Sequence, residues 1–137
     1  MIKVVFYGRG SKKMKPKYKW LQVRNVWSGE LIDGVSWEEE VPDGWYKAFG
    51  KEMIEELNDL LEKYNFVDKY QIIQIKEKYA ELRWYDNGVP LEMAEEYNEW
   101  LKKYEWLSYK TCINCGKPAT HMTKGWINPL CDDCDRS

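Results

Sequence analysis

Hydrophobic residues recur at regular intervals over residues 45–64, and this spacing predicts the first element. Apolar side chains lie three and four positions apart, which places them on one face of an α-helix: Trp45, Phe49, Met53, Leu57, Leu60, Leu61 and Tyr64. The acids of this segment fall largely on the other faces. Asp43 is expected to be the N-cap, because its carboxylate can accept the free backbone N–H groups of the first turn.

A second helix is predicted over residues 90–107. Pro90 suits the first helical position, where its missing N–H costs nothing. The apolar residues that follow repeat with helical spacing: Met93, Tyr97, Trp100, Leu101, Tyr104 and Leu107. Like the first helix, this one is amphipathic, so both are expected to pack on a common core.

Four short segments rich in β-branched and aromatic residues predict strands, at 2–8, 18–26, 70–75 and 82–85. The first two would pair around a basic loop at 9–17, and the last two would form an antiparallel hairpin with extended ends. Residues 29–44 are expected to be irregular and acidic. The fold class is therefore α+β, with a small antiparallel sheet packed against two amphipathic helices in a body that spans residues 1–110.

All four cysteines of the chain lie in its last part, in two pairs: Cys112, Cys115, Cys131 and Cys134. Each pair is separated by two residues, and fifteen residues lie between the pairs, which is typical of a four-cysteine zinc site. Zinc takes four ligands in a tetrahedron, so two such pairs complete one shell. An iron centre with the same ligands, disulfides and free thiols are the alternatives.

Residues 111–137 are thus expected to form a zinc-ribbon-like or treble-clef-like module that holds one Zn²⁺. Lys124 and Gly125 would make the turn between two short strands. Four thiolates leave no open position for water, so the zinc is expected to be structural rather than catalytic. His121, the single histidine, is expected to lie near the module without binding the metal.

Charge is distributed unevenly along the chain, although the formal net charge is only −2. Residues 1–25 contain eight bases and no acid, whereas residues 26–66 contain eleven acids and three bases. The basic arm could bind a polyanion through Arg9, Lys12, Lys13, Lys15, Lys17 and Lys19, with Trp20 available for stacking. Alternatively, the arm neutralises the acidic segment of its own fold.

No catalytic signature occurs in the chain, so we expect a protein that is not an enzyme. The strongest polar group lies on the predicted hairpin, where Lys76, Lys78 and Arg83 could converge on a phosphate, a carboxylate or a partner protein. The alternative is that these side chains point outward and pair with nearby acids. An enzyme that uses residues 76–83 ranks last among the functional hypotheses.

Three motifs occur in a fixed order: Asp43-Gly44-Trp45, then residues 74–85 (QIKEKYAELRWY), then the two cysteine pairs with Gly116 and Gly125-Trp126. In this order they resemble a group of small proteins found in bacteriophage and prophage genomes. Ala80 departs from that pattern, since a glycine is usual in this hairpin. The resemblance covers about residues 43–134 and implies a phage origin and a role in the cytoplasm of the bacterial host, but no known activity.

The leading functional hypothesis is a zinc-containing accessory protein that binds a host protein, for example as an inhibitor of a host or defence complex. The eight tryptophans, the acidic middle segment and the lack of catalytic motifs favour it. Nucleic-acid binding through the basic arm is the alternative. No segment approaches the length of a membrane span, so no membrane role is expected.

Overall fold

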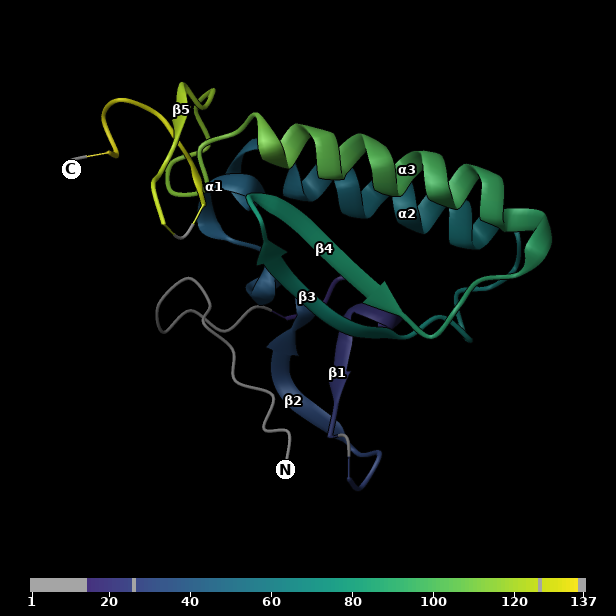
Figure 1. The fold of residues 1–137 in the computed structure, drawn as a ribbon. Helices are drawn as coiled ribbons and strands as arrows, with labels where there is room; N and C mark the ends of the chain where they lie inside the picture. Colours follow the sequence, from purple (N-terminus) through teal and green to yellow (C-terminus); the bar gives the residue numbers. More distant parts are fainter. Residues whose placement is uncertain (1–14, 26, 126, 136–137) are drawn as a thin grey trace.

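The computed structural model describes residues 15–25, 27–125 and 127–135. Figure 1 shows two long helices, α2 (Lys51–Lys63) and α3 (Leu91–Tyr109), lying side by side above a hairpin formed by β3 (Ile72–Lys78) and β4 (Glu81–Asp86). A second hairpin, β1 (Gln22–Arg24) and β2 (Leu31–Ser36), lies below β3. In the described part of the chain, no helix is long and apolar enough to cross a membrane.

The predicted α+β class is confirmed, although the strands are divided differently than expected. Within the described ranges they form three separate two-stranded antiparallel sheets rather than one small sheet. The third sheet pairs β5 (His121–Met122) with β6 (Pro129–Leu130) in the cysteine-rich segment. Each sheet is too small to be stable alone, so each depends on the helices or on another part of the chain for its stability.

The first predicted helix is present but begins earlier and contains an irregular turn. It starts with α1 (Asp43–Trp45), widens into a π-helical turn at Tyr46–Gly50 and continues as α2. The expectation that Asp43 is the N-cap is wrong, because Pro42 occupies the cap and Asp43 is the first helical residue. The second predicted helix is confirmed as α3, with Pro90 at the cap instead of the first helical position.

The predicted antiparallel hairpin is present as β3 and β4, but β3 spans Ile72–Lys78 rather than residues 70–75 and β4 spans Glu81–Asp86 rather than residues 82–85. Lys76 lies opposite Arg83, and Lys78 lies opposite Glu81, so two residues form the turn. Tyr79 and Ala80, the two turn residues, have φ angles of 53° and 70°. Such a turn requires positive φ at both positions and normally contains glycine or asparagine, so this hairpin keeps the usual shape without the usual residues.

The N-terminal half differs most from the sequence-based expectations. Residues 29–44 are not irregular, because they contain β2 and a short 3₁₀ helix at Trp37–Glu40. The predicted strand 18–26 is reduced to β1, since a 3₁₀ turn at Lys19–Leu21 precedes it. β1 pairs with β2, whose existence was not predicted. The predicted strand 2–8 lies outside the described residues.

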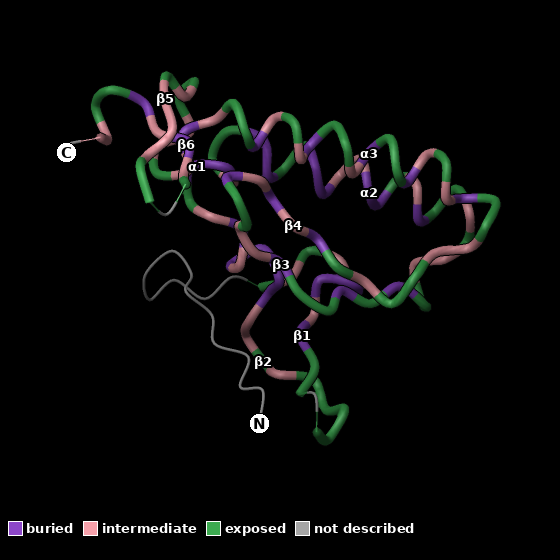
Figure 2. Tube along the Cα trace, in the orientation of Figure 1, coloured by how far each residue is buried: buried purple, intermediate pink, exposed green. Residues whose placement is uncertain are grey.

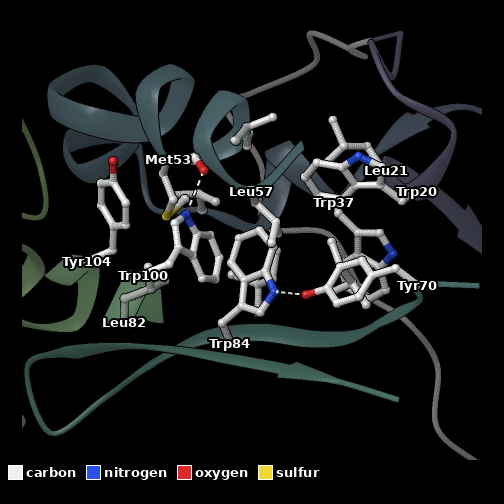
Figure 3. Packing of buried hydrophobic residues seen from close by; sticks show 14 of the residues in the cluster. Trp20, Leu21, Trp37, Met53, Leu57, Tyr70, Leu82, Trp84, Trp100 and Tyr104 are labelled. Carbon is white, nitrogen blue, oxygen red and sulfur yellow. Dashed lines mark hydrogen bonds between the residues drawn. The ribbon is translucent and has the colours of Figure 1, made fainter. Parts of the chain in front are cut away.

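Aromatic side chains make up much of the core. Five tryptophans are buried: Trp20, Trp37, Trp45, Trp84 and Trp100. Figure 3 shows two of their indole hydrogen bonds inside the core: Trp84 donates to the Tyr70 hydroxyl at 2.7 Å, and Trp100 donates to the Met53 carbonyl at 2.9 Å. Figure 2 shows that the buried positions of α2 and α3 lie on their facing and hairpin-facing sides. The aromatic excess therefore mainly fills the space between two helices and one hairpin.

Candidate metal centre

The first cysteine pair lies in a tight turn directly after α3. The Cys112 N–H donates to the Lys117 carbonyl at 2.7 Å, and the Gly116 N–H donates back to the Cys112 carbonyl at 3.0 Å. Gly116 has a φ of 86°, a conformation in which a side chain would be strained. The turn therefore needs glycine at this position to bring Cys112 and Cys115 to the same side.

The second pair follows β6. Both Cys134 and Asp135 donate their N–H groups to the Cys131 carbonyl, at 3.2 and 3.1 Å. A further backbone bond, from Ile113 to the Pro129 carbonyl at 2.9 Å, connects the two cysteine turns. The predicted pair of short strands around Lys124-Gly125 is confirmed as β5 and β6. These backbone hydrogen bonds bring the two cysteine turns together, and an ion pair between Lys117 and Asp133 at 3.2 Å also joins them.

The four sulfur atoms form one cluster, in which all lie within 4.8 Å of one another. The Cys115 and Cys131 Sγ atoms are 3.5 Å apart. Four sulfurs at a metal–sulfur distance of about 2.3 Å in a tetrahedron would be about 3.8 Å apart, so the cluster has the size of a single metal site. All four cysteines are free of disulfides. The predicted ligands are therefore grouped as a metal-binding cluster.

The thiols of this cluster differ in acidity. Burial raises the pKa of the Cys112 thiol, but the backbone N–H groups of Cys115, Cys131 and Asn114 lower it more in total, to about 6. Asn114 lowers the pKa of the Cys134 thiol with a hydrogen bond of 3.3 Å, yet the neighbouring Cys115 and Cys131 sulfurs raise it to about 12. Four negative sulfurs repel one another, so full ionisation needs a cation at the centre.

The metal centre is packed directly against the start of the helical body. A Cβ atom built on Gly44 would lie 2.2 Å from the Cys112 carbonyl oxygen and 2.6 Å from the carbonyl carbon of Ile113. The Gly44 N–H donates to the Ile113 carbonyl at 2.8 Å, and the Trp45 indole donates to the Thr111 carbonyl at 3.0 Å. Two motifs that are far apart in the sequence, Asp43-Gly44-Trp45 and the first cysteine pair, therefore meet in space.

His121 does not belong to the cysteine cluster. Its Nε2 atom contacts the Asp135 carboxylate, and its Nδ1 atom lies 2.9 Å from the Thr120 hydroxyl and 3.6 Å from Asp132. These contacts hold the β5–β6 hairpin against the last described residues. The His121 ring therefore lies among Thr120, Asp132 and Asp135, outside the four-cysteine cluster.

The three predicted hairpin residues do not converge on one point. Arg83 lies 3.3 Å from the Glu81 carboxylate, as the alternative interpretation expected. Lys76 lies over the Tyr85 ring at 5.8 Å, and Lys78 lies over the Tyr79 ring at 5.6 Å. The two lysines thus point to different rings, and the guanidinium group is paired with an acid of its own strand.

The described part of the basic arm is largely occupied by contacts with its own fold. Lys17 pairs with Glu55, and Lys19 lies 3.5 Å from Asp68. The expectation that Trp20 stacks on a ligand is wrong, because Trp20 is 3 % exposed and donates to Asn58 at 3.0 Å. Lys15 is exposed, whereas Arg9, Lys12 and Lys13 lie outside the described residues.

Comparison of the chain with protein-family models, with curated proteins and with solved structures gave no match. Functional inference therefore depends on the residues of this chain. Sequence reasoning missed the role of Gly44 in holding the metal module, since a helical glycine gives no distinctive signal. It also missed the Ser36-x-x-Glu39 capping box, in which the Ser36 N–H donates to Glu39 at 3.0 Å, although this spacing is a known helix-start signature.

Proposed function

We propose that this chain is a non-enzymatic accessory protein of a bacteriophage that binds a basic surface of a host protein. It would act in the bacterial cytoplasm as an inhibitor of a host or defence complex. The observation that supports this proposal is the strongly acidic face of α2 and α3. The two helices contain ten acids against four lysines, whereas the whole chain has a net charge of only −2.

A groove of about 460 Å³ runs between the two helices. Leu60 and Trp100 contribute apolar surface to it, and four acids line it: Glu56, Asp59, Glu96 and Glu99. The two lysines of the groove are already neutralised, since Lys63 pairs with Glu96 at 2.8 Å and Lys103 pairs with Glu56 at 2.7 Å. Within the described residues, neither Asp59 nor Glu99 has a basic partner.

A face of this kind attracts a basic partner and repels nucleic acid. Asp59 on α2 and Glu99 on α3 place unpaired negative charge along the groove, as phosphates do along a nucleic acid. Complementary potentials speed association and suppress partners of the wrong sign. The partner we infer is therefore a protein with a basic groove, such as a surface that normally binds nucleic acid.

We further propose that the four-cysteine cluster holds one structural Zn²⁺. Four thiolates fill a tetrahedral shell and leave no position for water, which a catalytic zinc requires. The module has few apolar residues of its own, so metal binding would supply much of its folding free energy. Iron binds the same ligand set, and metal analysis of the purified protein distinguishes the two.

Support for nucleic-acid binding through the basic arm is weaker. Lys17 and Lys19 face acids of their own fold, and Trp20 is buried in the core. These contacts favour the interpretation in which the arm neutralises part of its own fold.

Affinity capture with charge variants tests the proposal. The tagged chain is mixed with nuclease-treated host lysate, and bound proteins are identified. Neutralising three acids of the face (Glu52→Gln, Asp59→Asn and Glu99→Gln) should abolish capture of the partner. Neutralising three exposed acids elsewhere (Glu30→Gln, Asp33→Asn and Asp68→Asn) should leave capture unchanged. No captured protein, or equal loss with both variants, would refute the proposed function.

A further inference from the structure

Lysines lie over aromatic rings at six places in the described residues, and these pairs divide into two kinds. In three of them a glutamate completes the group, because it pairs with the lysine and accepts a hydrogen bond from the tyrosine hydroxyl. These closed groups are Lys17–Tyr18–Glu55, Lys63–Tyr64–Glu96 and Lys103–Tyr104–Glu56. Each closed group joins residues that are far apart in the sequence, so its role is structural.

The other three pairs have no acid, and we call them the open pairs. They are Lys76 over Tyr85 at 5.8 Å, Lys78 over Tyr79 at 5.6 Å and Lys110 over Trp106 at 4.1 Å. Among the described residues, none of these lysines has a carboxylate at ion-pair distance. Their rings are exposed to 42 %, 69 % and 59 %, respectively. Each open pair therefore presents an aromatic surface beside an uncompensated positive charge.

Two of the open pairs, Lys78–Tyr79 and Lys110–Trp106, lie at the tip of the β3–β4 hairpin and at the C-terminal end of α3, whereas the Lys76–Tyr85 pair lies farther along the hairpin, toward the end of β4. The Leu82 N–H donates to the Ser108 hydroxyl at 2.8 Å, which fixes the start of β4 against that end of α3. Figure 1 shows the tip of this hairpin close to the C-terminal end of α3. Glu81, the acid beside the tip, is already paired with Arg83 at 3.3 Å. Glu105, in the last turn of α3, lies near Arg83 and Glu81, and among the described residues it forms no ion pair with Lys78 or Lys110. The two lysines at this end therefore have no acid at ion-pair distance.

The turn that carries Tyr79 is held in a costly conformation. Tyr79 has a φ of 53°, in the left-handed region that a bulky residue rarely adopts. Its side chain is the most exposed of the three rings, so burial of the ring does not compensate for the strain. Residues held in such conformations cluster at functional sites. A contact with a partner is a reason to keep tyrosine where glycine would be less strained.

We infer that the two open pairs at this end, Lys78–Tyr79 and Lys110–Trp106, form a binding surface for single-stranded nucleic acid. Proteins that bind single strands without sequence preference combine basic side chains, which contact phosphates, with exposed aromatic rings, on which bases stack. Each open pair supplies one basic side chain and one exposed aromatic ring. Phosphate would take the place that a glutamate has in the closed groups, and an unpaired base would stack on the exposed ring.

Single strands fit this surface better than duplexes or acidic proteins. A duplex hides the faces of its bases, so it could use the lysines but not the rings. An acidic protein could also use the lysines, but it would not need two rings left open to solvent. The surface is separate from the acidic helix face, since none of its four residues lines the groove between α2 and α3.

Fluorescence anisotropy with a labelled oligothymidylate of about 20 nucleotides tests the inference on the full, metal-loaded chain. The wild-type chain should bind, and its affinity should fall as salt rises. Tyr79→Ala and Trp106→Ala should each weaken binding about tenfold, within the range measured for loss of one stacked base. Lys78→Gln with Lys110→Gln should weaken binding and reduce its salt dependence.

Matched variants make the result specific. Trp27→Ala removes a tryptophan that is 71 % exposed and lies outside this surface, so it should leave binding unchanged. Lys63→Gln removes the lysine of a closed group and should also have no effect. Tyr79→Gly should raise the melting temperature while it weakens binding, a combination that a purely structural role cannot produce.

Three outcomes would overturn the inference. The first is no binding by the wild-type chain, and the second is an equal effect of Trp106→Ala and Trp27→Ala. The third is equal, ring-dependent binding of polyglutamate, which would assign the surface to acidic proteins. The variant with three neutralised acids on the helix face should still bind the oligonucleotide, so failure of this inference and failure of the proposed function can be distinguished.

Discussion

Replacing Gly44 with alanine tests whether the metal module and the helical body are one cooperative unit. Helix propensity alone predicts that this change stabilises the protein by about 1 kcal/mol, because Gly44 lies in the first turn of a helix. Packing predicts the opposite sign. The added methyl would lie 2.2 Å from the Cys112 carbonyl oxygen, and that neighbour is backbone, which cannot rotate away.

The cost can be estimated from the contacts that must separate. Overpacking of this kind typically costs about 1–3 kcal/mol. Moving the helix start away also weakens the Gly44–Ile113 bond of 2.8 Å and the Trp45–Thr111 bond of 3.0 Å, each with a net value of about 1 kcal/mol. We expect a net loss of about 3 kcal/mol, which is a large part of the roughly 5–15 kcal/mol that stabilises a small domain.

Urea unfolding followed by tryptophan fluorescence measures this loss, and competition with a chelator measures the metal affinity. If the metal binds only to the packed cysteine turn, its affinity should fall by the same free energy, roughly 100-fold. Gly88→Ala is the control, because its Cβ would meet open space at a φ of 102°. It should cost about 1–2 kcal/mol without changing the metal affinity. A Gly44→Ala protein with the stability and the metal affinity of the wild type would refute the reasoning.

Further predictions concern the metal, the buried tyrosines and the strained turn. Cys112→Ser, or removal of the metal by a chelator, should unfold the cysteine module and raise the solvent exposure of Trp45, seen as a red shift of its fluorescence, while the circular dichroism of α2 and α3 largely remains. Burial raises the pKa of the Tyr70 and Tyr97 hydroxyls above the usual range of tyrosine, so these hydroxyls ionise at lower pH in the unfolded chain than in the folded one. The free energy of unfolding should therefore be unaffected by these groups below about pH 10 and fall above it. Urea unfolding midpoints measured across pH would show this fall. Tyr79→Gly should stabilise the chain by about 1 kcal/mol in the same assay, since glycine adopts positive φ without strain.

The elements that could be predicted from sequence are those with long, regular patterns or rigid chemical requirements. Two amphipathic helices and four cysteines with fixed spacing are examples, because helical periodicity and ligand geometry are local properties. β2 could not be found this way. Its six residues include Asp33 and Gly34, which are uncommon in strands, and its stability comes from pairing with β1 and from its neighbours.

The solvent exposure of individual aromatic residues also lay beyond sequence reasoning. Trp20 and Trp106 both lie among lysines in the sequence, yet Trp20 is in the core and Trp106 is exposed. What decides between them is a polar partner far away in the chain, namely Asn58, which accepts the Trp20 indole N–H inside the core. A single sequence gives no information about such long-range partners.

The closed and open lysine pairs explain how a chain with almost no net charge can present two surfaces of opposite sign. Each closed group uses one glutamate to hold one lysine, so those lysines are not free to neutralise Asp59 or Glu99 on the acidic face. Among the described residues, the lysines of the open pairs have no acid at ion-pair distance. Because charge is screened within about 10 Å at ordinary salt, each surface would respond to its own ligand. A chain with both surfaces could hold a basic protein and a single strand together, and salt should weaken both contacts, each through its own set of charges.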